Sequence, residues 1–183
     1  LGVLGQNGRG TAEHFGLEDE VDLIMGTFSK SFVSIGGFVA GEKKVVNYIK
    51  HNARPLIFSA AATPASVATV LAALEVIETE PERRERLWQI TRFMRESFQK
   101  MGFDTGPSQT PIIPIIIGHF EKCFAMWKAL KEAGIFTTPV IPPAVPAGQE
   151  LIRTSYSANH TDEELHQILA AFEMCGKALG IIH

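Results

Sequence analysis

The sequence lacks the features that mark several large classes of protein. Only two of its 183 residues are cysteines, Cys123 and Cys175, which lie far apart and show neither a metal-ligand spacing nor a disulfide framework. No apolar run approaches the roughly 20 residues that a membrane-spanning helix needs. The N-terminus also has no signal-peptide pattern. We therefore expect a reduced, cytoplasmic protein.

An excess of charge of one sign is absent too. The chain has 17 Lys and Arg against 20 Asp and Glu, a formal net charge of -3, and no basic cluster. We therefore expect neither nucleic acid nor a membrane surface as a partner. His14 has no second ligand at a suitable spacing, so we expect no metal site. With 45% hydrophobic and 20% charged residues, the composition is that of a globular protein.

The part of the chain before Thr79 is predicted to contain two strands and two helices. Residues 1–20 are glycine-rich and predicted to loop, without the order of a dinucleotide-binding motif. We expect a buried strand at 21–25, a returning strand at 36–40 and a helix at 42–52. Thr63 and Pro64 resemble the cap and first residue of a further helix. Its apolar stripe is predicted to be core: Val67, Val70, Leu71, Leu74 and Ile77.

A second helix start follows closely. Thr79 and Glu82 have the spacing of a capping box, leading into a charged amphipathic helix that Gly102 ends near Met101. Two consecutive helices with a Pro between them predict a kink, so we place the domain boundary at Glu80-Pro81.

Beyond Gly102 the pattern is strand, helix, strand, strand, helix, which is α/β in character. Pro114 predicts that the first of these strands is an edge strand or carries a bulge. Thr161, followed three residues later by Glu164, predicts a capping box for the last helix. The expected ranges are 112–117, 121–133, 135–141, 151–157 and 162–179.

The segment Gly26-Thr27-Phe28-Ser29-Lys30-Ser31 is the most informative one. A buried strand precedes it, the hydroxyls of Thr27 and Ser29 can hydrogen-bond a phosphate, and Lys30 can form a Schiff base with an aldehyde. Glycines at 36 and 37 would let the returning backbone pass close to a bound ring. This pattern predicts a pyridoxal phosphate site; the alternative is a polar turn with a solvated lysine.

Four separated segments then resemble one family in their order along the chain. They are LGVLGQNGRGTAEHFG with VDLIMGTFSKSFVSIGGFVAG, then RPLIFSAAATP from Arg54, VIPPAVPAG from Val140 and LIRTSYSANHT from Leu151. Together they resemble the α-oxoamine synthases, pyridoxal phosphate enzymes that condense an amino acid with an acyl-CoA and release carbon dioxide. Within that family the GTFSKSFVSIGGF and HNARPLIF segments are most similar to bacterial serine palmitoyltransferases, which act in sphingolipid biosynthesis.

The resemblance implies a fold-type I transferase, with residues 1–80 forming the C-terminal part of the large cofactor-binding domain and 81–183 the small α/β domain. It implies that Lys30 carries the cofactor and moves protons at the substrate α-carbon, which requires an ammonium that loses its proton readily. Thr27 and Ser29 would bind the phosphate. The family's further phosphate ligand, from a partner subunit in a homodimer, matches Ala61 here, so Ser59 or Thr63 would substitute, or the phosphate would be held more loosely.

Arg153 lies in an apolar strand, where an unpaired guanidinium is costly. The resemblance implies that it binds the substrate carboxylate, and a structural ion pair is the alternative. His160 is predicted to be structural. The Pro-rich loop 142–146 is either a border of the substrate entrance or a rigid connector.

Two family residues have no counterpart in these 183 residues: the Asp that pairs with the pyridine nitrogen and the His that stacks on the ring. We therefore expect the C-terminal part of a larger protein, inactive alone. Within the family, oxononanoate synthases and glycine C-acetyltransferases are alternatives, although their lysine loops usually read Gly-Lys-Ala. An aminotransferase is a more distant alternative. An accessory subunit without catalysis is the non-enzymatic one, and the presence of Lys30 argues against it.

Overall fold

The computed structural model describes all residues from Leu1 to His183. The chain divides into two compact units, Leu1–Arg84 and Glu85–His183, which are described separately. The division falls inside a helix, four residues beyond the expected boundary at Glu80-Pro81. No helix has the length and apolar character needed to cross a bilayer.

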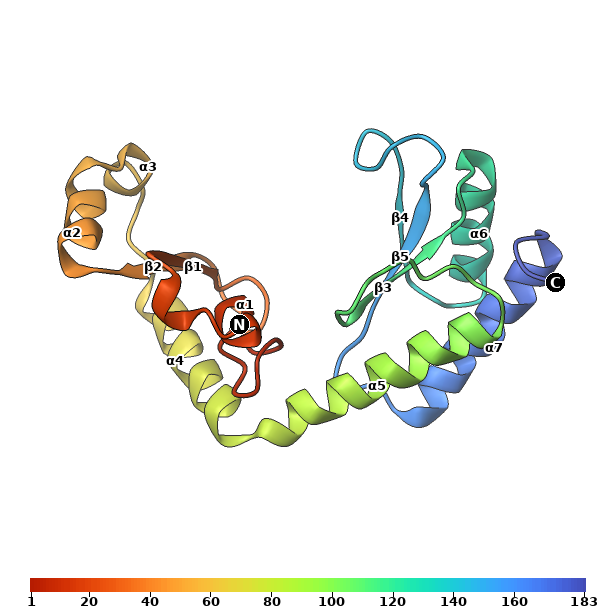
Figure 1. Cartoon of the computed structure of the whole chain (residues 1–183), viewed down its shortest axis with the longest axis horizontal. Coiled ribbons are helices and arrows are strands. Elements are labelled where there is room, and N and C mark those ends of the chain that lie inside the picture. The colour runs from red at the N-terminus through yellow and green to blue at the C-terminus, as the bar shows by residue number, and fades with distance from the viewer. The chain divides into compact units, whose positions relative to one another are not determined.

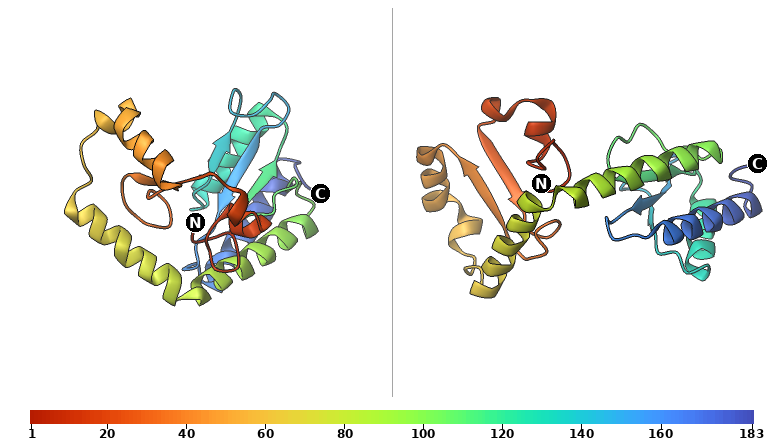
Figure 2. Two further views of the ribbon diagram at one scale, coloured as in Figure 1. Left: turned by 60° about the vertical axis from the view of Figure 1, so that its left-hand side comes forward. Right: turned by 90° about the horizontal axis from the view of Figure 1, so that it is seen from below.

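The first unit is built around a two-stranded antiparallel hairpin (Figure 1 and Figure 2). Strand β1 pairs with β2 so that Leu23 lies opposite Gly41 and Thr27 opposite Gly37. The glycine-rich start contains two short helices that the sequence did not predict. The elements of this unit are α1 (Thr11–Phe15), the 3-10 helix η1 (Glu18–Glu20), β1 (Leu23–Thr27), β2 (Gly37–Gly41), α2 (Lys43–Asn52), α3 (Arg54–Ile57) and α4 (Pro64–Thr79).

Helix α4 begins where the sequence predicts. The Thr63 hydroxyl accepts a hydrogen bond from the Ser66 N–H at 3.3 Å, and Pro64 occupies the first turn, where its missing N–H costs nothing. The cap at Thr63 is therefore confirmed.

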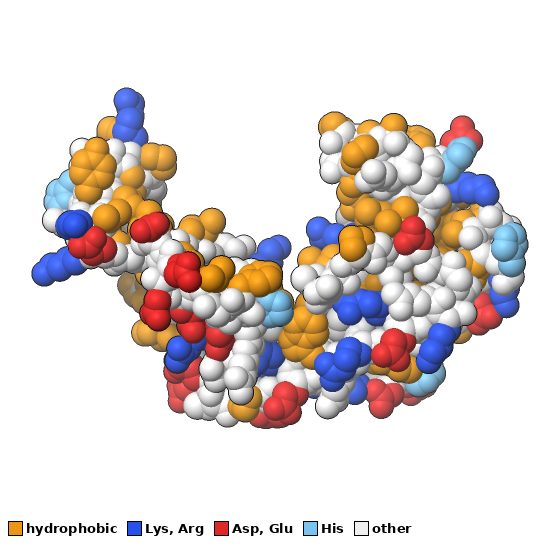
Figure 3. All heavy atoms as spheres, in the orientation of Figure 1, with side chains coloured by type: hydrophobic (Ala, Val, Ile, Leu, Met, Phe, Trp, Pro, Cys, Tyr) orange, Lys and Arg blue, Asp and Glu red, His pale blue; other side chains and the backbone are white.

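Two burial predictions in this unit are wrong. The strand expected at 21–25 forms two residues later, and its side chains are largely exposed, with Met25 at 76%. Helix α4 buries none of its residues, and Leu71 of the predicted core stripe is 62% exposed. The physical reason is that a hairpin and a few helices cannot cover both faces of these elements. Figure 3 shows apolar side chains at the surface over α2 and α3 as well.

The second unit is a three-stranded antiparallel sheet with helices on one face (Figure 1). The strand order is β3-β5-β4, so β3 is an edge strand, as Pro114 predicts. The order of elements after residue 102 matches the expected one. They are β3 (Ile112–Ile116), α6 (Phe120–Glu132), β4 (Thr138–Val140), β5 (Leu151–Ser155) and α7 (Asp162–Ala178), preceded by α5 (Pro81–Lys100), of which residues 85–100 belong to this unit.

The core of this unit lies between the sheet and its three helices. Each helix contributes one apolar face at helical spacing, and the strands contribute alternate residues, as a sheet covered on one side requires. Among the buried side chains are Ile90, Met94 and Phe98 of α5, Cys123, Met126 and Leu130 of α6, Leu165, Leu169 and Phe172 of α7, and Ile113, Ile115 and Ile152 of the sheet.

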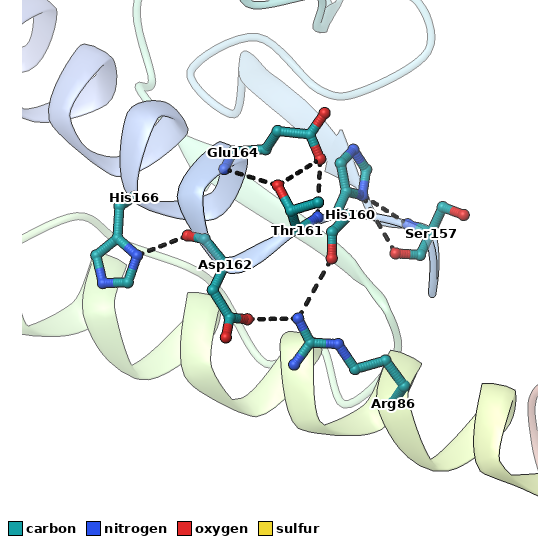
Figure 4. Close-up of polar contacts among 7 residues, drawn as sticks. All are labelled: Arg86, Ser157, His160, Thr161, Asp162, Glu164 and His166. Carbon is teal, nitrogen blue, oxygen red and sulfur yellow. Dashed lines mark hydrogen bonds and ion pairs between the residues drawn. The ribbon is translucent and has the colours of Figure 1, made fainter.

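The two predicted capping boxes have different outcomes. At α7 the box is present: the Glu164 N–H donates to the Thr161 hydroxyl, and the Glu164 carboxylate accepts the Thr161 N–H at 2.8 Å (Figure 4). At Thr79 the prediction is wrong, because Thr79 is still helical in α4 and its hydroxyl donates to the Glu75 carbonyl. Glu80 is instead paired with Arg83.

Candidate active site

The predicted lysine segment forms a closed loop, residues 28–36, between β1 and β2, which we call the lysine loop. The Phe28 N–H donates to the Gly36 carbonyl at 2.9 Å, and the Ser34 N–H donates to the Phe28 carbonyl at 2.8 Å. A sharp loop at the end of a hairpin presents its side chains outward from a fixed backbone. This is the position that the sequence predicts for a cofactor-binding group.

Two hydroxyl groups converge at the start of the lysine loop. The oxygens of Thr27 and Ser29 lie 2.9 Å apart, and the Ser29 N–H donates to the Thr27 hydroxyl at 3.3 Å. Both residues are exposed. Two neighbouring hydroxyls at one point form a pair of donors that suits a phosphate oxygen. The predicted phosphate ligands are thus brought together.

Lys30 follows these hydroxyls directly. Its side chain is exposed and makes no hydrogen bond or ion pair within the chain, while its carbonyl accepts the Val33 N–H at 3.0 Å. Its ammonium is therefore available to a ligand.

Several residues that hold the lysine loop in place were not identified from the sequence. Phe32 is buried and its ring lies 5.5 Å from that of Phe28, edge to face. The Ser34 hydroxyl donates to the Ser66 carbonyl of α4 at 3.1 Å, and the Ser31 hydroxyl donates to the Leu1 carbonyl at 2.8 Å. The four-residue spacing of the two phenylalanines was the one signal in the sequence.

The glycine at position 37 is explained by close approach. A Cβ atom added there would lie 2.5 Å from the Gly26 carbonyl oxygen of the neighbouring strand. The sequence assigned this glycine to the passage of the backbone near a cofactor, and the strand pairing alone already requires it.

The hydroxyls of Ser59 and Thr63, which could substitute for a phosphate ligand at Ala61, both have hydrogen-bond partners within the chain. Thr63 is used as the cap of α4 and also hydrogen-bonds the Ser66 hydroxyl at 2.9 Å. The Ser59 hydroxyl donates to the Pro55 and Leu56 carbonyls. Both substitutes for Ala61 therefore have local structural roles.

Arg153 occupies the centre of the sheet in the second unit. It lies in the middle of β5, the central strand, paired with Pro114 on one side and Thr138 on the other. Its neighbours Ile152 and Thr154 point into the core, so Arg153 lies on the face without helices, where it is exposed. The guanidinium of Arg153 has no ion pair or hydrogen bond, so the structural ion pair considered as an alternative is not formed within the chain.

His160 has a local structural contact, as predicted. The Ser157 N–H donates to its Nδ1 at 3.0 Å, which closes the turn before α7 (Figure 4). No group of three His, Cys, Asp or Glu side chains is arranged to hold a metal ion. Lys30 and Arg153 belong to different units.

Comparison with known proteins gives consistent matches over the whole chain. The chain is 51% identical over 177 residues to a serine palmitoyltransferase of Sphingobacterium spiritivorum, covering 94% of this chain and 44% of that protein. It is 44% identical over 181 residues to an 8-amino-7-oxononanoate synthase of Symbiobacterium thermophilum, covering 99% and 46%. A solved structure described as SPT with PLP as an internal aldimine superimposes with a TM-score of 0.94 at 36% identity, covering 100% of this chain and 46% of that one.

The chain therefore spans just under half the length of these relatives. Their structures confirm the predicted fold class, a part of a fold-type I transferase. The family model for aminotransferase class I and II matches residues 2–172. The resemblance to pyridoxal phosphate enzymes is thus confirmed at the level of the family. The chain belongs to the aminotransferase class I and II family.

Proposed function

We propose that this chain supplies the lysine and the arginine of a pyridoxal phosphate enzyme that condenses L-serine with palmitoyl-CoA. The products would be 3-ketodihydrosphingosine, carbon dioxide and coenzyme A, a step of sphingolipid biosynthesis. The observation that carries the proposal is the start of the lysine loop, where two hydroxyls 2.9 Å apart precede an unpaired Lys30.

The residues present fit the cofactor. Thr27 and Ser29 offer donors for its phosphate, and Lys30 offers an amine for its aldehyde, adjacent in one fixed loop. When bound, pyridoxal phosphate supplies the electron sink for a carbanion at the amino-acid α-carbon. Lys30 would then hold the cofactor before the amino acid binds, and would accept and return the proton at that carbon.

Arg153 would orient the amino acid. A guanidinium without a partner in the chain can take a carboxylate through two parallel hydrogen bonds. We assign residues 1–80 to the large cofactor-binding domain and residues 81–183 to the small domain. We further propose a cytoplasmic homodimer, with each active site shared between two subunits.

A second candidate is the synthesis of 8-amino-7-oxononanoate from alanine and pimeloyl-CoA. The 44% identity to an enzyme with that name supports it. The Ser29-Lys30-Ser31 sequence of the loop favours the serine palmitoyltransferase assignment instead. A competition assay separates the two candidates.

We predict a steep dependence of the rate on acyl-chain length. Each methylene buried in an apolar channel contributes about 0.8 kcal/mol, which is about fourfold in binding. The active protein should therefore prefer palmitoyl-CoA to pimeloyl- and acetyl-CoA. The proposed assignment also predicts a preference for serine over alanine and glycine. The measurement is carbon dioxide release for each of the nine substrate pairs.

Two results would contradict this assignment. A preference for alanine with pimeloyl-CoA would favour the oxononanoate synthase, and a preference for glycine with acetyl-CoA would favour a glycine C-acetyltransferase. Either result would retain the family and change the substrate.

A further inference from the structure

The second unit contains a pocket that the proposed function does not use. It lies between the segment that joins α6 to β4, the end of β5 and the N-terminal half of α7, and has a volume of about 300 Å³. We call it the edge pocket. Such a volume is at the low end for small-molecule sites. Its lining combines apolar and polar groups: Gly134, Ile135, Phe136, Thr137, Thr154, Ser155, Tyr156, His160, Glu164, Gln167, Ile168 and Phe172.

Two hydroxyl groups of the edge pocket are buried without a hydrogen-bond partner. Thr137 is only 6% exposed, and its Oγ1 has no partner. The Tyr156 hydroxyl is also buried and unpartnered. Buried polar groups are normally hydrogen-bonded, and leaving one unsatisfied costs free energy. Two such groups in the lining of one pocket indicate that a ligand completes them.

The protein itself does not satisfy the Tyr156 hydroxyl. Burial raises the pKa of this phenol, and the neighbouring Thr154 hydroxyl opposes the shift. Thr154 donates its proton to the Ile113 carbonyl at 2.8 Å. The Tyr156 phenol is therefore protonated at neutral pH, and Tyr156 is one of the residues that line the pocket.

The formal charge of the edge pocket comes from Glu164. Its Oε2 accepts the N–H and the hydroxyl of Thr161, and these hydrogen bonds lower the pKa of the Glu164 carboxyl (Figure 4). The carboxylate is thus ionised at neutral pH, and its Oε1 makes no hydrogen bond within the chain. The Ser157 N–H donates to Nδ1 of His160 at 3.0 Å, so this ring nitrogen is already used within the chain. No Lys or Arg lines the pocket.

We infer that the edge pocket binds a small aliphatic amine that carries hydroxyl groups. Its ammonium would pair with Glu164, and its hydroxyls would hydrogen-bond Thr137 and Tyr156. The apolar side chains of Phe172 and Ile168, which also line the pocket, would contact the carbon atoms of the amine. This site is independent of the proposed function.

Other ligand classes match the lining less well. A carboxylate or phosphate would meet Glu164 without any basic side chain to compensate. A hydrocarbon would leave the two buried hydroxyls unsatisfied. A neutral polyol could satisfy the hydroxyls but would gain nothing from the charge.

The test compares serinol with glycerol and propylamine, which lack its amine and its hydroxyls respectively. Ligand titrations are followed by NMR of the protein. We expect saturable binding of serinol, with both comparison compounds about tenfold weaker or more. Tyr156→Phe and Thr137→Val, which remove one hydroxyl each, should weaken serinol binding about three- to tenfold. Tyr48→Phe, at the only other tyrosine, should have no effect.

The charge is tested with Glu164→Gln. Glutamine can retain the capping box, so α7 should remain folded while the carboxylate is lost. We expect about tenfold weaker serinol binding and unchanged glycerol binding. Equal affinity for serinol and glycerol, an unaltered affinity in the Tyr156→Phe and Thr137→Val variants, or no saturable binding would each overturn the inference. Those outcomes would assign the two hydroxyls to bound water.

Discussion

Replacement of Lys30 by alanine is expected to lower the condensation rate by about 10⁴-fold or more. Proton transfer by a positioned side chain contributes about 10²- to 10⁴-fold, and the covalent hold on the cofactor is lost in addition. The fold should be retained, because the Lys30 side chain is exposed and unpaired, and the hydrogen bond from the Val33 N–H to the Lys30 carbonyl does not depend on the side chain. The measurement is the single-turnover rate of carbon dioxide release from serine in the presence of palmitoyl-CoA.

The matched control is Lys43→Ala, at the exposed first residue of α2 in the same unit. That variant should keep the normal rate and the normal thermal unfolding midpoint. A Lys30→Ala protein with a rate within about tenfold of normal would contradict the assignment of Lys30. Such a loss is smaller than the roughly 10²-fold that a positioned proton-transfer group contributes at least.

Arg153→Ala is expected to weaken amino-acid binding by roughly 2 to 4 kcal/mol, the range for losing a charge-assisted bidentate contact. This corresponds to roughly a 30- to 800-fold increase in the dissociation constant. Arg153→Lys should recover only part of the affinity, because an ammonium cannot reproduce the planar fork of the guanidinium. The spectral change on titration with serine measures the dissociation constant without requiring turnover.

Because the Arg153 side chain is exposed, its effect on serine binding can be measured without a change in stability. The side chain is on the open face of the sheet and has no partner in the chain, so its removal should leave the unfolding midpoint unchanged. Arg92→Ala, at an exposed position of α5, serves as the control. A variant that loses stability but binds serine normally would show that Arg153 is structural.

Local signals in the sequence predicted local structure well. Thr63 and Thr161 both cap helices as expected, because a hydroxyl before a helix can satisfy an otherwise unpaired N–H. Pro114 correctly indicated an edge strand, since proline cannot donate to a ladder. The capping box predicted at Thr79 is wrong because a threonine hydroxyl can also donate to the carbonyl four residues earlier within a helix, as that of Thr79 does to Glu75.

Burial could not be predicted in the same way. The apolar residues of β1 and α4 are those of core elements, yet most are exposed in this chain. Hydrophobic periodicity shows which face seeks a partner, but the partner must be supplied by other residues. The chain spans less than half the length of the relatives it matches. The unpartnered hydroxyls of Thr137 and Tyr156 carried no signal in the sequence at all.

The central claim is that Lys30 holds pyridoxal phosphate, and peptide mapping after borohydride reduction tests it most directly. The active protein is reduced with borohydride, digested and analysed by mass spectrometry for the lysine that carries the cofactor. We predict that the label lies on Lys30 alone and that the visible absorption of the cofactor disappears on reduction. Label on any other lysine, or no chromophore in protein with Lys30 intact, would contradict the account.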